Sequence, residues 1–132
     1  MPVARRFAQG TTVTLDKTLL EIQTLLRKKG AKKVSVQYSD DACAVLCELC
    51  DRVLKFTISL TGARDEAEKR RRWRCMLMTI RGRFTELAEE MGVFEEIFLA
   101  NIVVNPEGHT VYETLAGRLP TITSLPTLAE RN

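Results

Sequence analysis

Arginine side chains that could bind phosphate are concentrated in one stretch of this chain. The cations of that stretch are Lys69, Arg70, Arg71, Arg72, Arg74, Arg81 and Arg83. The planar guanidinium group of arginine forms paired hydrogen bonds with phosphate oxygens and stacks on aromatic rings. Recognition of a phosphate-bearing ligand is therefore the first chemistry that the sequence suggests.

The same stretch is predicted to form one long helix over residues 65–91. Its apolar residues recur at spacings of four and three: Trp73, Leu77, Ile80, Phe84, Leu87 and Met91. At about 100° per residue they form one stripe, which would pack on the rest of the protein. The 4-3 pattern also suits pairing with a second helix, as in a coiled coil, but it extends over fewer than about three heptads.

Arginines border both edges of the apolar stripe. At about 100° per residue, Arg70, Arg74 and Arg81 lie along one edge, and Arg72 and Arg83 lie along the other. We predict a ligand site in which arginines hold phosphate and aromatic rings stack. Its residues are Arg70, Arg72, Arg74, Arg81, Trp73 and Phe84.

Two other interpretations of the arginines stay open. They could extend from the core edge and pair with Asp65, Glu66 and Glu68 of the same helix. They could instead contact a partner protein. Several of them lie in the first half of the helix, where the helix dipole disfavours cations, so a bound anion or an acidic partner would stabilise them there.

The cysteines form the sharpest motif, because Cys43, Cys47 and Cys50 have the C-x3-C-x2-C spacing of the iron–sulfur loop in radical SAM enzymes. The chain is too short for the barrel of such an enzyme. The three residues lie in an apolar stretch, where cysteine behaves as a small hydrophobe. A zinc site completed by Cys75 stays open, although structural zinc sites usually use paired cysteines in turns. We predict no metal, no cofactor and no disulfide.

Catalytic motifs are missing from the sequence. His109 is the one histidine, and its position just after a turn indicates a surface or capping role. There is no Gly-x-Ser-x-Gly, no phosphate-binding glycine loop and no His-Glu-x-x-His. We therefore predict that the protein is not an enzyme and that it has no catalytic residues.

The elements around the long helix follow from capping residues and alternation. A capping box at Thr18 and Glu21, with a helix stop at Gly30, predicts a helix at about residues 19–29. Alternating apolar residues predict strands at 34–38 and 53–60. A continuous apolar run predicts a strand at 42–49 that is covered on both sides.

The second half of the chain carries further stop and start signals. Gly92 is predicted to end the long helix, and a short helix follows near residue 94. Residues 105–108 read Asn-Pro-Glu-Gly, which favours a turn. Thr110 and Glu113 form a second capping box, and Gly117 can end the helix that it opens.

These elements predict an α+β fold of order α-β-β-β-α-α, in which a three-stranded antiparallel meander packs on one long amphipathic helix. Residues 1–17 are predicted to be a flexible arm, 18–117 a single domain, and 118–132 a flexible tail. One long helix covers only one face of such a sheet. We therefore expect a homo-oligomer, most simply a two-fold dimer.

Length and composition limit the class of protein. The chain has 132 residues, is 45% hydrophobic and carries a net charge of +3, which suits one globular domain and does not by itself imply nucleic acid. No apolar run approaches the roughly 18 residues that cross a membrane. Since the start also lacks a signal peptide pattern, we expect a cytoplasmic protein with no membrane association.

Several segments resemble small uncharacterised proteins of phages, prophages and mobile elements. The resemblance spans about residues 18–115, in the same order, and implies a helix–β-meander–helix layout but no functional residue. Its segments are Thr18 to Leu26, Gly30 to Ala31, Arg72 to Leu77, Phe94 to Ala100, and Gly108 to Glu113. Small phage proteins of this kind often counter host defence, some by sequestering nucleotide signals.

Two functions are consistent with these observations. The first is a non-enzymatic phage-type accessory protein that binds a phosphate-bearing ligand such as a cyclic nucleotide, and so sequesters an immune signal. The alternative is an oligomeric interaction module that binds or inhibits a host protein or a nucleic acid. The first predicts a saturable thermal shift with cyclic nucleotides, and the second predicts none. A nucleic-acid complex would weaken steeply with salt.

Overall fold

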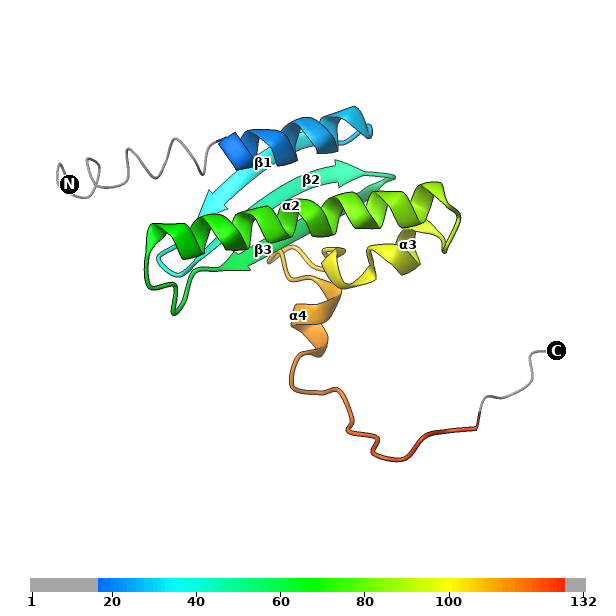
Figure 1. The fold of residues 1–132 in the computed structure, drawn as a ribbon. Helices are drawn as coiled ribbons and strands as arrows, with labels where there is room; N and C mark the ends of the chain where they lie inside the picture. The colour runs from blue at the N-terminus through cyan, green and yellow to red at the C-terminus, as the bar shows by residue number, and fades with distance from the viewer. Residues whose placement is uncertain (1–16, 128–132) are drawn as a thin grey trace.

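The computed structural model describes residues 17–127 and shows a three-stranded sheet flanked by helices (Figure 1). A helix over residues 17–28, the N-terminal helix, comes first. The elements after it are β1 (Lys32–Tyr38), β2 (Ala42–Leu49), β3 (Arg52–Ser59), α2 (Glu66–Ala88), α3 (Phe94–Ile97), the 3-10 helix η1 (Leu99–Asn101) and α4 (Val111–Leu115). The α+β class and the predicted order of strands and helices are confirmed.

The sheet is an antiparallel meander of order β1-β2-β3, as predicted. Val45 at its centre lies opposite Val36 of β1 and Phe56 of β3. The turn between β2 and β3 has only two residues, Cys50 and Asp51, with φ angles of 53° and 62°. Two consecutive residues with positive φ match the twist of the flanking strands, so this short turn fixes the register of the β2–β3 pair.

One face of the sheet carries the hydrophobic core. Alternate residues of β2 and β3, such as Val45 and Phe56, are buried on this face beneath Leu77 and Ile80 of α2. Ile22 of the N-terminal helix belongs to the same core cluster. The sheet therefore packs on two helices that lie side by side (Figure 1), and not on the long helix alone as predicted.

The opposite face of the sheet is open to solvent over much of its area. The predicted cover on both sides of β2 is therefore wrong, because Leu46 and Glu48 of this strand are only half-buried. The apolar run that misled the prediction includes Ala42 and Ala44. Ala44 is nevertheless buried, because a methyl group between neighbouring strands is shielded by longer side chains beside it.

The two long helices both end in a left-handed residue, but only one of these is glycine. Gly30 has φ of +101°, and the amide of Ala31 donates to the carbonyl of Leu26, which confirms the predicted stop. The prediction for α2 is wrong. Its last turn closes through Glu90, with φ of 58°, two residues before Gly92.

The segment after α2 packs against the outer edge of β3. Ile102 forms a bridge with Leu54, and the predicted turn closes through a bond from the Gly108 amide to the Asn105 carbonyl. Both hydrogen bonds of the second predicted capping box, between Thr110 and Glu113, are present and open α4. The rings of Phe56, Phe84 and Phe94 surround Phe98, with centroids 4.9–6.3 Å from its own.

The predicted terminal segments fall largely outside the described residues. Of the predicted N-terminal arm, 1–17, only Lys17 is described, and it is helical. Lys17 precedes Thr18 in that helix, so the predicted first capping box does not mark the first helical residue. Residues 118–127 of the predicted tail form neither helix nor strand, and 128–132 are not described. Within residues 17–127, no helix has the length and hydrophobicity needed to cross a membrane.

Candidate functional site

The structure does not bring the predicted site residues together, and Arg72 forms hydrogen bonds within the protein. Its guanidinium donates to the carbonyl oxygens of Ser59 at 2.7 Å and Thr61 at 3.0 Å, and to Glu68 Oε2 at 2.9 Å. These bonds tie the first turns of α2 to the end of β3. The pKa of Glu68 is held below its ordinary value, first by the hydrogen bond from the Arg64 amide and then by the bond from the Arg72 guanidinium. Arg72 is therefore occupied by the protein itself, and its assignment as a phosphate ligand is corrected.

Arg74 and Arg81 lie on the other side of α2, toward the N-terminal helix. Each approaches a carboxylate oxygen of Glu21, at 3.9 Å and 4.0 Å. Their side chains are 61% and 56% exposed, so one carboxylate at long range satisfies two cations only weakly. Both guanidinium groups keep most of their donors directed toward solvent.

Arg70 and Arg71 form no hydrogen bond or ion pair with another residue in the range 17–127. Arg71 is exposed, whereas Arg70 is half-buried. Arg70 lines an open depression of about 500 Å³ at the start of α2, where Asp65 and Glu66 supply opposing charge. The predicted site did not include Arg71. A helical projection places Arg71 far from the apolar stripe, and this position was a signal in the sequence that its side chain is exposed.

The two aromatic residues of the predicted site are in the hydrophobic core. Trp73 is 1% exposed and Phe84 is 6% exposed. The ring of Phe84 packs on Phe98, and the ammonium group of Lys29 lies 5.7 Å from its centroid. Neither ring leaves a face for a ligand, so both stacking assignments are corrected. Their places in the apolar stripe already pointed to the core.

Several accessible cations lie on the surface of the two-helix layer that does not face the sheet. We name this surface the basic ridge. It consists of Arg70, Arg71, Arg74 and Arg81 of α2 together with Arg27 and Lys28 of the N-terminal helix. The buried residues of both helices face the sheet, so Arg71 lies on the outer side of α2. Arg74 and Arg81 lie at the side of α2 toward the N-terminal helix, and Arg70 is half-buried.

Arg83, on the same edge of α2 as Arg72, is also structural. Its guanidinium donates to the carbonyl of Ile97 at 3.0 Å and to Asn101 Oδ1 at 3.2 Å. The amide group of Asn101 in turn donates to the Lys55 carbonyl at 3.0 Å. One edge of α2 is thus fixed to β3 and α3 by its arginines, while the other edge presents its arginines to solvent.

The cysteines do not converge on a metal site. Cys43 and Cys47 are buried on the core face, and burial raises the pKa of each thiol to about 11. Cys50 lies in an exposed turn and Cys75 is exposed on α2. Among the described residues no group of histidine, cysteine or carboxylate side chains could hold a metal ion, and all four thiols are free.

His109 is part of a turn. The side chain of Asn105 accepts a hydrogen bond from the His109 amide at 3.0 Å and contacts its Nδ1 atom at 3.1 Å. The His109 imidazole therefore contacts the Asn105 side chain of the turn that precedes it, in agreement with a capping role.

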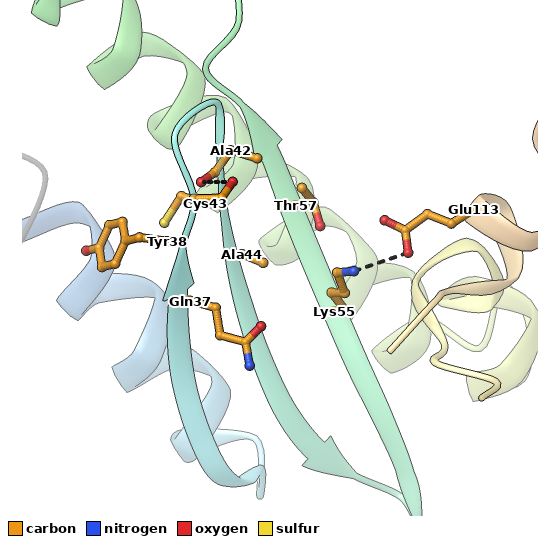
Figure 2. A pocket seen from close by; sticks show the side chains of 9 residues that line it. Gln37, Tyr38, Ala42, Cys43, Ala44, Lys55, Thr57 and Glu113 are labelled. Atoms are coloured by element: carbon orange, nitrogen blue, oxygen red, sulfur yellow. Dashed lines mark hydrogen bonds and ion pairs between the residues drawn. The ribbon is translucent and has the colours of Figure 1, made fainter. Parts of the chain in front are cut away.

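A shallow depression lies on the open face of the sheet, and Figure 2 shows its lining. It has a volume of about 280 Å³, its floor includes Ala42 and Ala44, and Lys55 and Glu113 stand at its rim. The ammonium group of Lys55 donates to Glu113 Oε1 at 3.2 Å and to the Gly108 carbonyl at 3.0 Å. This cation is neutralised within the protein, so the depression offers an anion little attraction.

No family model, curated protein or solved structure matches this chain. The fold and the site define a small α+β domain with an exposed basic helix layer. The resemblance to small phage and prophage proteins stays a prediction.

Proposed function

We propose that this protein is a non-catalytic binding module whose basic ridge contacts the phosphates of a nucleic acid. The observation that carries the proposal is the weak pairing of three arginines of α2, Arg71, Arg74 and Arg81. Arg71 has no partner in the range 17–127, and Arg74 and Arg81 share one distant carboxylate. Cations in this state are ready to exchange solvent for phosphate oxygens without breaking a structural bond.

The length of the ridge favours an extended polyanion. Arg70 and Arg81 are separated by eleven residues, which is about 16 Å along a helix. Consecutive phosphates of one strand in duplex DNA are separated by about 3.4 Å along the axis, so several phosphates fit this distance. A single cyclic nucleotide could reach only part of the row.

The burial of the aromatic rings also argues against a compact nucleotide site. A base held by stacking needs an accessible ring face, and Trp73 and Phe84 offer none. Phosphate contacts position a nucleic acid without reading its sequence. We therefore expect binding that depends on charge and backbone geometry more than on base sequence.

The proposal is tested by fluorescence anisotropy with a labelled single-stranded oligonucleotide and the matching duplex. The ridge variant replaces Arg71, Arg74 and Arg81 by Gln. The matched control replaces Lys33, Arg52 and Arg118 by Gln, which removes the same charge from exposed positions outside the ridge. We expect the ridge variant to bind at least about tenfold more weakly than the control, because each lost phosphate contact removes released counterions.

Equal weakening in both variants would mean that net charge alone attracts nucleic acid, and it would overturn the proposal. Absence of binding by the wild-type protein at low salt would do the same. A saturable thermal shift with cyclic nucleotides, without nucleic-acid binding, would instead support the sequestration of a nucleotide signal. The phage setting and an anti-defence role are proposals that depend on the nature of this ligand.

A further inference from the structure

A short motif occurs twice in the segment that follows α4. Residues 119–122 read Leu-Pro-Thr-Ile, and residues 125–128 read Leu-Pro-Thr-Leu, six positions later. Proline favours the polyproline II conformation, in which every third residue returns to the same side of the chain. In that conformation the apolar residues at the ends of both motifs share one side. Such spacing is typical of a segment that binds an apolar groove.

The described part of this segment is exposed. Figure 1 shows residues 118–127 leaving α4 and extending away from the sheet and the helices. The side chain of Ile122 is 72% exposed and that of Leu125 is 98% exposed. No hydrogen bond or ion pair connects residues 119–127 with another residue in the range 17–127. Two large apolar side chains are therefore available for contact with another surface.

The first motif already borders an apolar depression beside α4, which we name the α4 depression. Leu119 lines it together with Tyr112 and Leu115 of α4, and with Ile97 of α3 and Leu99 of η1. Its volume is about 370 Å³, which exceeds the volume of one leucine side chain. The structure thus places the leucine of the first motif at a surface that has room for a further apolar side chain.

The chemistry of the α4 depression suits an apolar ligand. Most of the large apolar side chains that are exposed among the described residues come after α2, and several of them line this depression. Arg83 and Glu96 are its charged lining residues. The guanidinium of Arg83 already donates to the Ile97 carbonyl and to Asn101, so it is not available to an anion.

The second motif does not reach this depression of its own chain while the segment stays extended. In polyproline II form the chain advances about 3.1 Å per residue, so Leu125 lies about 19 Å beyond Leu119. The prolines at 120 and 126 favour that extension, and residues 118–128 contain no glycine that would ease a reversal. The same depression on a second copy is therefore the surface that matches the second motif.

We propose that Leu125 of each chain binds in the α4 depression of a second copy, so that two chains exchange these segments. The first motif stays beside its own depression, and Leu125 of the second copy fills the volume that Leu119 borders. A two-fold axis relates the two contacts and closes the dimer. The two depressions then lie within about 19 Å of each other. This dimer does not depend on the proposed function, because it is measured without nucleic acid.

The test is analytical ultracentrifugation of the full chain, with one variant in each half of the contact. Leu125→Asp removes the apolar side chain of the segment, and Ala100→Arg fills the depression from an exposed position of η1. We expect the wild type to form dimers at tens of micromolar. Each variant should raise the dimer Kd about a hundredfold, because a buried leucine accounts for at least about tenfold and each dimer contains the contact twice.

A mixture of the two variants separates this arrangement from others. Leu125→Asp keeps an open depression and Ala100→Arg keeps an intact segment, so a mixed dimer contains one complete contact. We expect the mixture to associate about tenfold more tightly than either variant alone. Two segments that bind each other would leave Ala100→Arg dimeric, and two depressions that bind each other would leave Leu125→Asp dimeric. Either result would overturn the proposal.

Met91→Asp is the matched control, because Met91 is also exposed and lies outside the segment and the depression. This variant should leave the dimer unchanged, and far-ultraviolet circular dichroism should be the same for all the variants. A wild-type chain that is monomeric at about 200 μM would overturn the proposal, also where the segment folds onto its own depression. So would an equal loss of affinity in Met91→Asp and Leu125→Asp, or a mixture no better than the variants alone.

Discussion

Replacement of Arg72 by Ala should destabilise the fold while a neighbouring arginine replacement does not. Arg72 donates to the Ser59 and Thr61 carbonyls, which belong to the end of β3 and the loop after it. A hydrogen bond from a charged donor contributes about 1.5–3 kcal/mol when buried. The Arg72 side chain is 30% exposed and water can solvate both carbonyls, so about 1 kcal/mol for each bond is more realistic.

The expected loss is therefore about 2 kcal/mol in the free energy of unfolding. Urea unfolding should show a lower midpoint with an unchanged m-value, and the Tm should fall by about 6–10 °C. Arg74→Ala is the matched control on the same helix. Its long contact with Glu21 is exposed, so its effect should stay below about 0.5 kcal/mol. Equal losses in the two variants would refute the division of these arginines into structural and free ones.

Three further predictions follow from other parts of the molecule. Glu90→Gly should stabilise the protein by about 0.5–1 kcal/mol in urea unfolding, because glycine adopts the left-handed conformation at this helix end more readily than glutamate. A thiol reagent at pH 8 should modify two cysteines rapidly and two only after unfolding, since Cys50 and Cys75 are exposed while Cys43 and Cys47 are buried with pKa values of about 11. The pKa of Glu113 is lowered although its burial acts to raise it, because the Thr110 amide and the Lys55 ammonium group favour the carboxylate. That stabilisation is present above the ordinary pKa of 4.5 and is lost as pH falls through the lower folded value, so Glu113→Gln should reduce the loss of stability in acid.

These predictions have clear opposing outcomes. A destabilised Glu90→Gly protein would show that the glutamate side chain supports the helix end. Rapid modification of all four thiols in the native protein would contradict the burial of the β2 cysteines. An acid unfolding curve identical for wild type and Glu113→Gln would remove the role of that carboxylate in pH-dependent stability.

The elements of the fold could be predicted because each leaves a local signal. Val34 and Val36 alternate with polar residues, Gly30 supplies a left-handed stop, and Thr110 and Glu113 match the capping-box pattern. These features depend on residues a few positions apart. The end of α2 was misplaced because Glu90, a residue that rarely adopts positive φ, takes the position that glycine usually occupies.

The site could be predicted only in part, because contacts with residues far apart in the sequence decide which arginines are bound within the protein and which stay exposed. A helical projection separates Arg72 from Arg74, and the structure confirms that they lie on different sides of α2. A projection cannot show that Arg72 donates to the Ser59 carbonyl, or that among the described residues Arg74 is approached only by Glu21. The burial of Trp73 was available from its place in the apolar stripe, and the prediction of stacking disregarded that signal.

The salt dependence of oligonucleotide binding tests the basic ridge most directly. Anisotropy titrations between 50 and 200 mM salt give the slope of log K against log salt for the wild type and for the Arg71, Arg74 and Arg81 triple variant. With about one counterion released per phosphate contact, the triple variant should lose a slope of about three. Identical slopes in the two proteins would show that these arginines do not contact phosphate.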